Sequence, residues 1–303
     1  MNLIRSIILS CFAMLLVFEA QAEEKEYPPY YKVATVNGSM NDVARSVKTA
    51  LESHDFEVIG QYNPGNNDSL VVLCYTRKDF ADISLKFEDR GALASVMKVG
   101  LKNNDGQIDV SMINPEYIFY AYFYEGIDPY ISKLEAMEKD VKTALSVIGD
   151  DFEPFGGFEE RDDLEDYRYK IMMPYFTDPV DLTEYDSFEQ GLSIIRGNLD
   201  AGIGNTVKVY EVVYPDHKVA IFGVGLLDPE DGEAAFLPII GADHVAAMPY
   251  EIILQDKEVT MLHGRYRIAL HWPELGMGTF MKIMSTPGNI EDFMLGITEF
   301  EED

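Results

Sequence analysis

Cysteine is almost absent from this chain of 303 residues, which contains two, Cys11 and Cys74. Cys11 lies in an N-terminal segment that we expect to be removed, so Cys74 would remain alone. A single thiol forms no disulfide within the chain, and the packing of the core therefore has to hold the fold together. Cys74 lies in an apolar run with no cation before Arg77. This setting favours a buried small hydrophobic residue over a reactive thiol.

Positive charge is also scarce. The chain has 24 Lys and Arg residues against 53 Asp and Glu residues, which gives a formal net charge of −29 at pH 7. Such a surface repels phosphate backbones and anionic lipid head groups. We therefore expect no nucleic-acid partner and no binding to a membrane surface. An acidic, well-solvated exterior is the simplest interpretation of this charge.

Long apolar runs are missing except at the N-terminus. Residues 6–18 are apolar apart from Ser6 and Ser10, they follow the positive charge of Arg5, and Ala20-Gln21-Ala22 supplies the small residues of a cleavage site. This pattern is typical of a secretory signal peptide at residues 1–22. We expect a soluble, periplasmic or secreted protein with no membrane span in its mature chain.

Several well-marked catalytic motifs are missing as well. The chain contains no Gly-x-Gly-x-x-Gly, no Walker phosphate loop, no His-Glu-x-x-His, no Gly-x-Ser-x-Gly and no Cys-x-x-Cys. Those motifs mark the best-known nucleotide, zinc-hydrolase and serine-hydrolase sites. The sequence therefore predicts no cofactor and assigns no catalytic or metal-binding residue.

The second half of the chain repeats the pattern of the first. Ser39 with Asp42 and Ser187 with Gln190 each begin an amphipathic helical pattern, at an offset of 148 residues, and residues 259–262 follow residues 110–113 at an offset of 149. Helical and alternating patterns follow in the same order in both halves. The sequence predicts an α+β fold with two similar two-layer domains, each a mostly antiparallel sheet packed against helices.

The expected domains are residues 23–148 and 180–303. Between them, residues 149–179 are rich in acidic residues and contain Gly156-Gly157. This composition predicts an exposed acidic linker that runs into a strand at Tyr169–Met173.

Each half resembles the domain of unknown function 302 family. The matching segments are residues 39–51, 70–75, 94–113 and 114–117 in the first half, and 187–199, 219–224 and 246–262 in the second. The second half departs from the family pattern where Gly264 stands in place of a proline. The resemblance implies two divergent tandem copies of a compact α+β domain, paired within one chain. It implies no catalytic residues.

Unusual residues are concentrated between Phe236 and Met284, a stretch that contains three of the five histidines and the only tryptophan. The candidate ligand-binding residues are His244, His263, Arg265 and His271. Imidazoles near a carboxylate can ligate a metal or share a proton. No pair of these histidines has the i, i+4 spacing of a specific metal site, so histidines that are hydrogen-bonded in turns are the favoured explanation of the pattern.

Three methionines follow this cluster. Met277, Met281 and Met284 have the spacing i, i+4, i+7, which favours a stripe that faces the core of the domain. Soft thioethers also suit Cu(I) in exported proteins. We expect the stripe to pack in the core, and copper handling through His and Met side chains is kept as an alternative.

Aromatic residues gather at corresponding places in the two halves, at Tyr117–Tyr124 and Tyr266–Trp272. We predict that these two segments meet in an intramolecular contact between the domains. Pairing with a second copy of the chain is left open.

The sequence thus favours an exported, non-catalytic module that binds a small molecule or a protein. One alternative is an enzyme with an unmarked active site in the second domain, around the four candidate residues. Another is a purely structural module with a stable protein partner.

Overall fold

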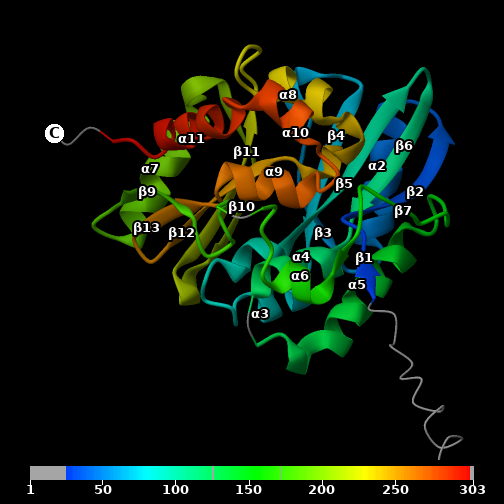
Figure 1. The fold of residues 1–303 in the computed structure, drawn as a ribbon, viewed down its shortest axis with the longest axis horizontal. Coiled ribbons are helices and arrows are strands. Elements are labelled where there is room, and N and C mark those ends of the chain that lie inside the picture. Colours follow the sequence, from blue (N-terminus) through cyan, green and yellow to red (C-terminus); the bar gives the residue numbers. More distant parts are fainter. Residues whose placement is uncertain (1–24, 125, 171, 301–303) are drawn as a thin grey trace, which may run out of the picture.

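The computed structural model describes residues 25–124, 126–170 and 172–300, so the expected signal peptide at residues 1–22 lies outside the described residues. Within these ranges the predicted fold class is confirmed. The protein is α+β, with antiparallel sheets packed against helices (Figure 1). None of the helices in these ranges is both long and apolar enough to cross a bilayer.

The structure is built on two larger sheets and a small ribbon. The first sheet has the order β3-β4-β5-β6-β2-β7, and its strands are β2 (Tyr30–Asn37), β3 (Glu57–Tyr62), β4 (Leu70–Thr76), β5 (Val96–Asn104), β6 (Gln107–Ile113) and β7 (Glu153–Phe155). The second has the order β10-β11-β12-β13-β9, and its strands are β9 (Val180–Glu184), β10 (Thr206–Tyr214), β11 (Val219–Leu226), β12 (Tyr250–Gln255) and β13 (Glu258–Met261). The ribbon pairs β1 (Glu26–Tyr27) with β8 (Glu159–Glu160).

The two larger sheets share one strand order. In each, the strand that comes first in the chain lies beside the last strand of a hairpin: β2 pairs with β6, and β9 pairs with β13. The other strands follow one another as antiparallel neighbours. We call residues 30–155 the first half and residues 180–300 the second half. In the first half, β7 adds one further strand beside β2.

The helices also come in the same order in both halves. The first half carries α2 (Met40–Glu52), η1 (Pro64–Asn66), α3 (Lys78–Ser84), η2 (Gly91–Ser95), α4 (Pro115–Phe123), η3 (Asp128–Tyr130) and α5 (Ile131–Leu145). The second carries α7 (Phe188–Asp200), η4 (Ile203–Asn205), η5 (Pro215–His217), α8 (Glu233–Ile240), η6 (Ala242–Ala247), α9 (Gly264–His271), α10 (Met277–Phe280), η7 (Met281–Ile283) and α11 (Thr286–Gly296). Between the halves lies α6 (Arg161–Glu165).

The predicted helix starts are confirmed. The Ser39 hydroxyl accepts a hydrogen bond from the Asp42 N–H at 3.2 Å, and the Ser187 hydroxyl accepts one from the Gln190 N–H at 3.2 Å. Each bond satisfies an N–H group that has no partner inside its helix. The same local chemistry therefore begins α2 and α7.

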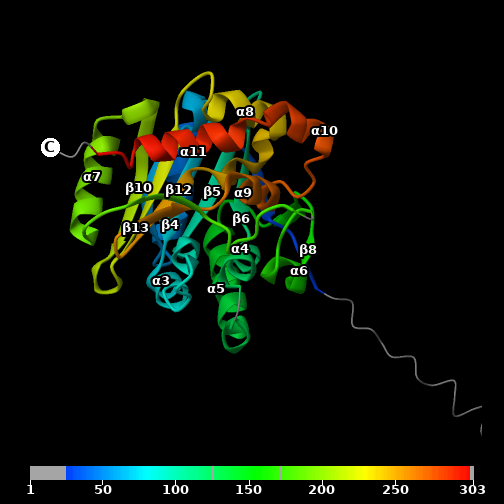
Figure 2. The same ribbon diagram turned by 60° about the vertical axis from the view of Figure 1, so that its left-hand side comes forward.

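The two halves are in direct contact through their sheets. A Cβ atom added at Gly60 in β3 would lie 2.4 Å from the Val209 carbonyl oxygen in β10, and one added at Gly100 in β5 would lie 2.6 Å from the Val245 side chain in η6. Glycine is thus required at both places because the other half comes so close. In both views α5 and α11 lie on opposite sides of the molecule (Figures 1 and 2).

The aromatic helices α4 and α9 complete this contact. The Tyr117 hydroxyl donates to the Leu270 carbonyl at 2.8 Å, and the Tyr266 hydroxyl donates to the Ala121 carbonyl at 3.1 Å. Both tyrosines are buried. The two aromatic segments therefore meet where the halves join, as their matching positions in the sequence predict.

The segment between the halves is only partly the predicted exposed linker. Leu164, Tyr167 and Phe176 are buried, and the Tyr167 hydroxyl donates to the Ala269 carbonyl at 2.9 Å. The predicted strand at Tyr169–Met173 is wrong, because the described residues there form bends and a turn. The apolar residues anchor this segment on α4 and α9 instead of extending it beside a sheet.

The prediction that the methionine stripe faces the core is also wrong. The exposed fractions of Met277, Met281 and Met284 are 49%, 57% and 60%. In this region α10 passes into the short helix η7, and Ile283 supplies the buried contact at 2% exposure. The helical spacing is real, but the methionine face points away from the core.

Candidate functional site

Two of the candidate histidines meet at the contact between the halves. His271 is the last residue of α9, and its Nδ1 lies 3.0 Å from the Tyr30 hydroxyl of β2. His244, in η6, donates from Nδ1 to the His271 carbonyl at 2.8 Å. Its ring stacks on Trp272 with the ring centres 5.5 Å apart. These histidines therefore fix the C-terminal end of α9 against the first half.

Both histidines are held neutral by their surroundings. Burial lowers the pKa of His271 well below its ordinary value, and the cations Arg267 and Lys98 lower it further. Burial also lowers the pKa of His244, against the opposing effect of its hydrogen bond to His271. A neutral imidazole at position 271 accepts the Tyr30 hydroxyl at Nδ1. The pair is thus suited to a structural role at neutral pH.

The other two candidates lie at the opposite end of α9. His263 is the N-cap of this helix, and its Nδ1 accepts a hydrogen bond from the Arg265 backbone N–H at 3.2 Å. Burial lowers the pKa of His263, and the charge of Arg265 lowers it further. The structure therefore separates the four candidates into two pairs, one at each end of α9. Within the described ranges, no group of three or more His, Cys, Asp or Glu side chains is placed to hold a metal ion.

An apolar hollow of about 190 Å³ lies along one face of α9. The helix contributes Arg265, Ile268 and Ala269, which share one face because they are spaced i, i+3, i+4, and its C-cap Trp272 continues this face. The remaining lining residues come from the segment before the second half and from the residues that follow α9: Tyr169, Lys170, Met173, Leu275, Met277 and Phe280. We call this hollow the α9 pocket.

Hydrogen bonds fix the walls of the α9 pocket. The Tyr169 hydroxyl donates to the Leu275 carbonyl at 3.0 Å, which ties the covering segment to the chain beyond α9. The Trp272 indole N–H donates to the Gly241 carbonyl at 3.2 Å. Because both aromatic side chains are anchored through their polar atoms, their apolar faces are held in place around the hollow.

Two cations line the α9 pocket. Arg265 and Lys170 are exposed, and neither forms an ion pair with a residue that the structure describes. The Lys170 ammonium lies 4.9 Å from the centre of the Tyr169 ring. The described lining includes no Asp, Glu, His or Cys. The pocket therefore combines apolar walls with positive charge, in a chain that is strongly acidic.

The sequence reasoning found Arg265 but missed the pocket around it. The spacing of residues 265, 268, 269 and 272 was a readable signal for one helix face. The covering wall, however, comes from Tyr169, Lys170 and Met173, far away along the chain. No local pattern links the two segments, and the strand predicted for the covering segment would have placed it elsewhere.

A second charged cluster is sealed inside the contact between the halves. The Glu251 carboxylate accepts hydrogen bonds from Lys98, from Arg267 at 3.0 Å and from the Tyr210 hydroxyl at 3.3 Å. Burial alone would raise the pKa of Glu251, but the charges of Lys98 and Arg267 outweigh burial and hold it below its ordinary value. Since all three charged residues are buried, this cluster joins the halves and offers no open binding site.

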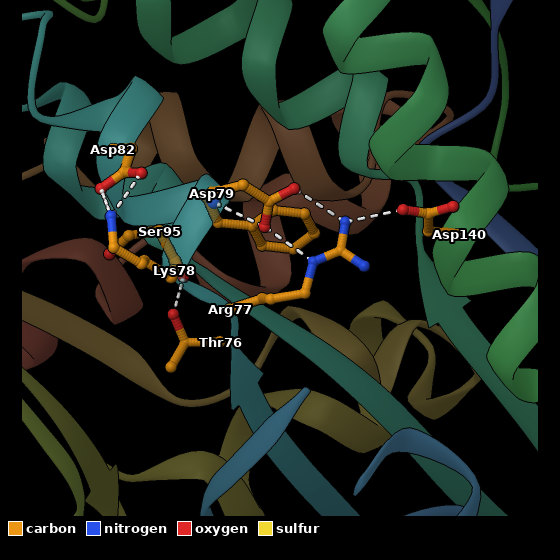
Figure 3. A network of polar contacts seen from close by, with 8 residues as sticks. Thr76, Arg77, Lys78, Asp79, Asp82, Ser95 and Asp140 are labelled. Atoms are coloured by element: carbon orange, nitrogen blue, oxygen red, sulfur yellow. Dashed lines mark hydrogen bonds and ion pairs between the residues drawn. The ribbon is translucent and has the colours of Figure 1, made fainter. Parts of the chain in front are cut away.

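A third cluster, at the start of α3, is also satisfied internally (Figure 3). Arg77 donates to Asp79 at 2.7 Å and to Asp140 of α5 at 2.9 Å, and its guanidinium lies over the Phe56 ring. Lys78 pairs with Asp82 at 2.7 Å. Each cation faces a carboxylate, so this cluster ties α3 to α5 and leaves no charge for a ligand.

Comparisons with known proteins give little further information. No family model matches the chain, and no curated protein matches it. One solved structure, of an uncharacterized conserved DUF302 protein from Bacillus stearothermophilus, aligns with 39% of this chain and 96% of that chain, at 16% identity and a TM-score of 0.32. Function therefore has to be inferred from the side chains of this chain.

Proposed function

We propose that this protein is an exported, non-catalytic binding module, and that the α9 pocket takes a small molecule with an apolar body. The supporting observation is a preformed hollow with aromatic and thioether walls, Trp272, Phe280, Met277 and Met173, whose described lining includes no Asp, Glu, His, Cys, Ser or Thr side chain. Pockets with apolar walls and a few polar groups are the usual form of small-molecule sites. Export through residues 1–22 places the protein in the periplasm or outside the cell.

The size of the hollow limits the ligand. An apolar cavity of about 150 Å³ holds one benzene molecule. The α9 pocket, at about 190 Å³, is suited to one aromatic ring or a short aliphatic chain. Larger ligands would have to extend past its mouth, where Met277 is half exposed.

The four candidate residues take different parts in this proposal. Arg265 lines the pocket and contacts the ligand. His263 caps the helix that carries Arg265. His244 and His271 are positioning residues, because they hold the C-terminal end of α9 in place, and Trp272 is the next residue along the chain. This division explains why residues so far apart on α9 serve one site.

We also propose that the halves are divergent tandem copies of a domain like that of the domain of unknown function 302 family, covering residues 23–148 and 180–303. The shared strand order and the shared order of helices support a duplication. Residues 149–179 then connect the copies and supply a wall of the α9 pocket. Pairing within one chain leaves each copy free to diverge at the contact.

The only tryptophan of the chain lines the pocket, so its fluorescence reports occupancy directly. We expect the neutral probe 3-phenylpropan-1-ol to change Trp272 fluorescence in a saturable way. Ala269→Phe should abolish this change, because it places a ring inside the hollow. Ala201→Phe, the same substitution at an exposed position at the end of α7, is the matched control.

Two results would contradict the function. Undiminished binding by the Ala269→Phe variant would show that the pocket is not the site. Failure of the wild type to bind any of a panel of small aromatic probes would show that the hollow takes no such ligand. A further variant, Phe280→Ala, guards against misfolding of Ala269→Phe, because it should enlarge the pocket and favour two-ring probes over one-ring probes.

Copper handling is a second candidate, supported by the exposure of Met277, Met281 and Met284. Three exposed thioethers on one helical face are accessible to Cu(I), which buried side chains would not be. Competition for Cu(I) against a chromogenic chelator tests this. The triple leucine variant should lose the binding while Met172→Leu, at another exposed methionine, retains it. Equal competition by all three proteins would contradict the copper function.

A further inference from the structure

We propose that the ligand of the α9 pocket is a monocarboxylate with an apolar body, and that Arg265 and Lys170 hold its carboxylate. This inference rests on the proposed function and names the chemical class of the ligand. The apolar walls take the body of the molecule, and the two cations lie among the same lining residues.

Among the described residues, most arginines form ion pairs and Arg265 does not. In a chain with 53 acidic and 24 basic residues, arginines are expected to find carboxylates. Six do so, each within ion-pair distance of a described carboxylate: Arg45, Arg77, Arg90, Arg161, Arg196 and Arg267. Among the described residues Arg265 has no such carboxylate, and Arg168 instead lies over the ring of Tyr175. Arg265 is thus one of two described arginines without an ion pair, and it is the one that lines the apolar hollow.

The equivalent place in the first half carries a charged pair. α4 and α9 follow equivalent hairpins, and Glu116 is the second residue of α4 as Arg265 is of α9. Glu116 is buried and pairs at 3.2 Å with Lys25, which comes from the segment before β2. In the first half, the charge at this position therefore has a partner of opposite sign from outside the helix. In the second half the charge at this position is reversed, and no described carboxylate lies within ion-pair distance of Arg265.

The contact between a guanidinium and a carboxylate is strong and directional. A guanidinium can bind both oxygens of a carboxylate through two parallel N–H groups. The attraction is stronger beside apolar walls than in open water, because the local dielectric is lower. A flexible ammonium such as that of Lys170 adds a point charge without fixing the geometry. Arg265 should therefore set the specificity, and Lys170 should add to the affinity.

The net charge of the protein makes this proposal easy to distinguish from general electrostatics. At −29, the chain as a whole attracts cations and repels anions. A preference for a carboxylate over an ammonium of the same shape must then arise locally, at the pocket. Added salt should weaken the repulsion by the whole chain more than it weakens the contact with Arg265, which is short-range.

The experiment compares three probes that differ only in their head group: 3-phenylpropionate, 3-phenylpropan-1-ol and 3-phenylpropylammonium. Each is titrated against the full chain by Trp272 fluorescence and by calorimetry. We expect the carboxylate to bind about ten-fold more tightly than the alcohol, and the ammonium to bind most weakly. Arg265→Gln should remove the preference for the carboxylate over the alcohol.

Arg168→Gln is the matched control, because it removes an arginine that is also without a described ion pair but lies outside the described lining of the pocket. The Arg168→Gln variant should keep the full preference for the carboxylate over the alcohol. Lys170→Gln should reduce this preference by a smaller factor than Arg265→Gln does. If the alcohol binds as tightly as the carboxylate, or the ammonium binds most tightly, the inference is overturned and the apolar site stands. If none of the three probes binds, the inference and the proposed function both fail.

Discussion

The two halves of the molecule share a strand order, yet they carry opposite charges where they touch. Lys98 in β5 of the first half pairs with Glu251 in β12 of the second. Both side chains are buried, so the pair lies inside the contact between the halves.

These two residues occupy equivalent positions. Lys98 lies three residues before Leu101, which pairs with Val110 across the first hairpin. Glu251 lies three residues before Leu254, which pairs with Val259 across the second hairpin. Two identical copies would place like charges against each other at this point, which costs free energy in a buried contact. The halves of one chain can carry complementary residues instead. The contact therefore favours pairing of the first half with the second over pairing of like halves.

Replacement of Glu251 should have the largest effect on stability. Glu251→Gln leaves the buried charges of Lys98 and Arg267 without a counterion, and we expect a loss of about 3–5 kcal/mol in the free energy of unfolding. Lys98→Met should cost less, since Glu251 keeps Arg267 as its partner. Denaturation by urea measures both changes. If the two variants lose equal amounts of stability, Arg267 does not stabilise the Glu251 carboxylate.

The same change should alter the response to acid. The folded-state pKa of Glu251 lies below its unfolded value, so its contribution is present above the unfolded pKa and is lost as pH falls through the folded pKa. The Glu251→Gln variant should lack this acid-induced loss. Urea denaturation at a series of pH values below about 4.5 tests this point.

The halves differ again at the acidic residue in the first turn of an equivalent helix. In α3 this residue is Asp79, which pairs with Arg77 in a partly exposed cluster (Figure 3). In α8 it is Glu233, which is fully buried and accepts hydrogen bonds from the Tyr62 hydroxyl and the Gly65 N–H, both at 2.8 Å. One carboxylate has a cation beside it, and the other accepts its hydrogen bonds from neutral donors.

This difference predicts a dependence of stability on pH. Burial raises the pKa of Glu233 from 4.5 to about 7, although its hydrogen bonds oppose the shift. The folded state then holds its proton where the unfolded state has lost it, so the stability from this group falls as pH rises from 4.5 towards 7. The difference between the folded and unfolded pKa values of Glu233 corresponds to about 3 kcal/mol in the free energy of unfolding. Glu233→Gln should remove this fall in urea denaturation series, whereas Asp79→Asn should leave it in place.

The sequence predicted those parts of the fold that local chemistry determines. The caps at Ser39 and Ser187 and the helices that follow them were readable, because each depends on residues that are neighbours along the chain. The repeated order of these patterns also predicted that the halves would be alike. Similar local signals in the same order lead to the same strand order.

The contacts between distant segments could not be read in this way. Met277, Met281 and Met284 have core-like spacing, but which side of a short helix is covered depends on what packs there. The pairing of Lys98 with Glu251 depends on the register between two sheets. The four candidate site residues were chosen for their chemistry, and the structure separates them into two pairs along α9.

The α9 pocket is the third difference between the halves, and it predicts the smallest change. Ala269 of α9 stands where α4 has Tyr120, because both are the sixth residue of equivalent helices. The ring of Tyr120 packs against Tyr27 with the centres 4.8 Å apart, so the equivalent face of the first half is filled. The hollow thus lies where the second half has an alanine in place of the aromatic side chain of the first half.

Ala269→Tyr restores that side chain and should convert the second half to the filled state of the first. Filling an apolar hollow commonly adds about 0.5–2 kcal/mol to stability, and we expect about 1 kcal/mol for this variant, since the added hydroxyl can reach water at the mouth. The variant should melt at a higher temperature and lose its response to small aromatic probes. If the variant is stabilised but still binds the probes, the faces of α4 and α9 at these positions are not equivalent. If it is destabilised, the walls of the α9 pocket are too rigid to admit a ring.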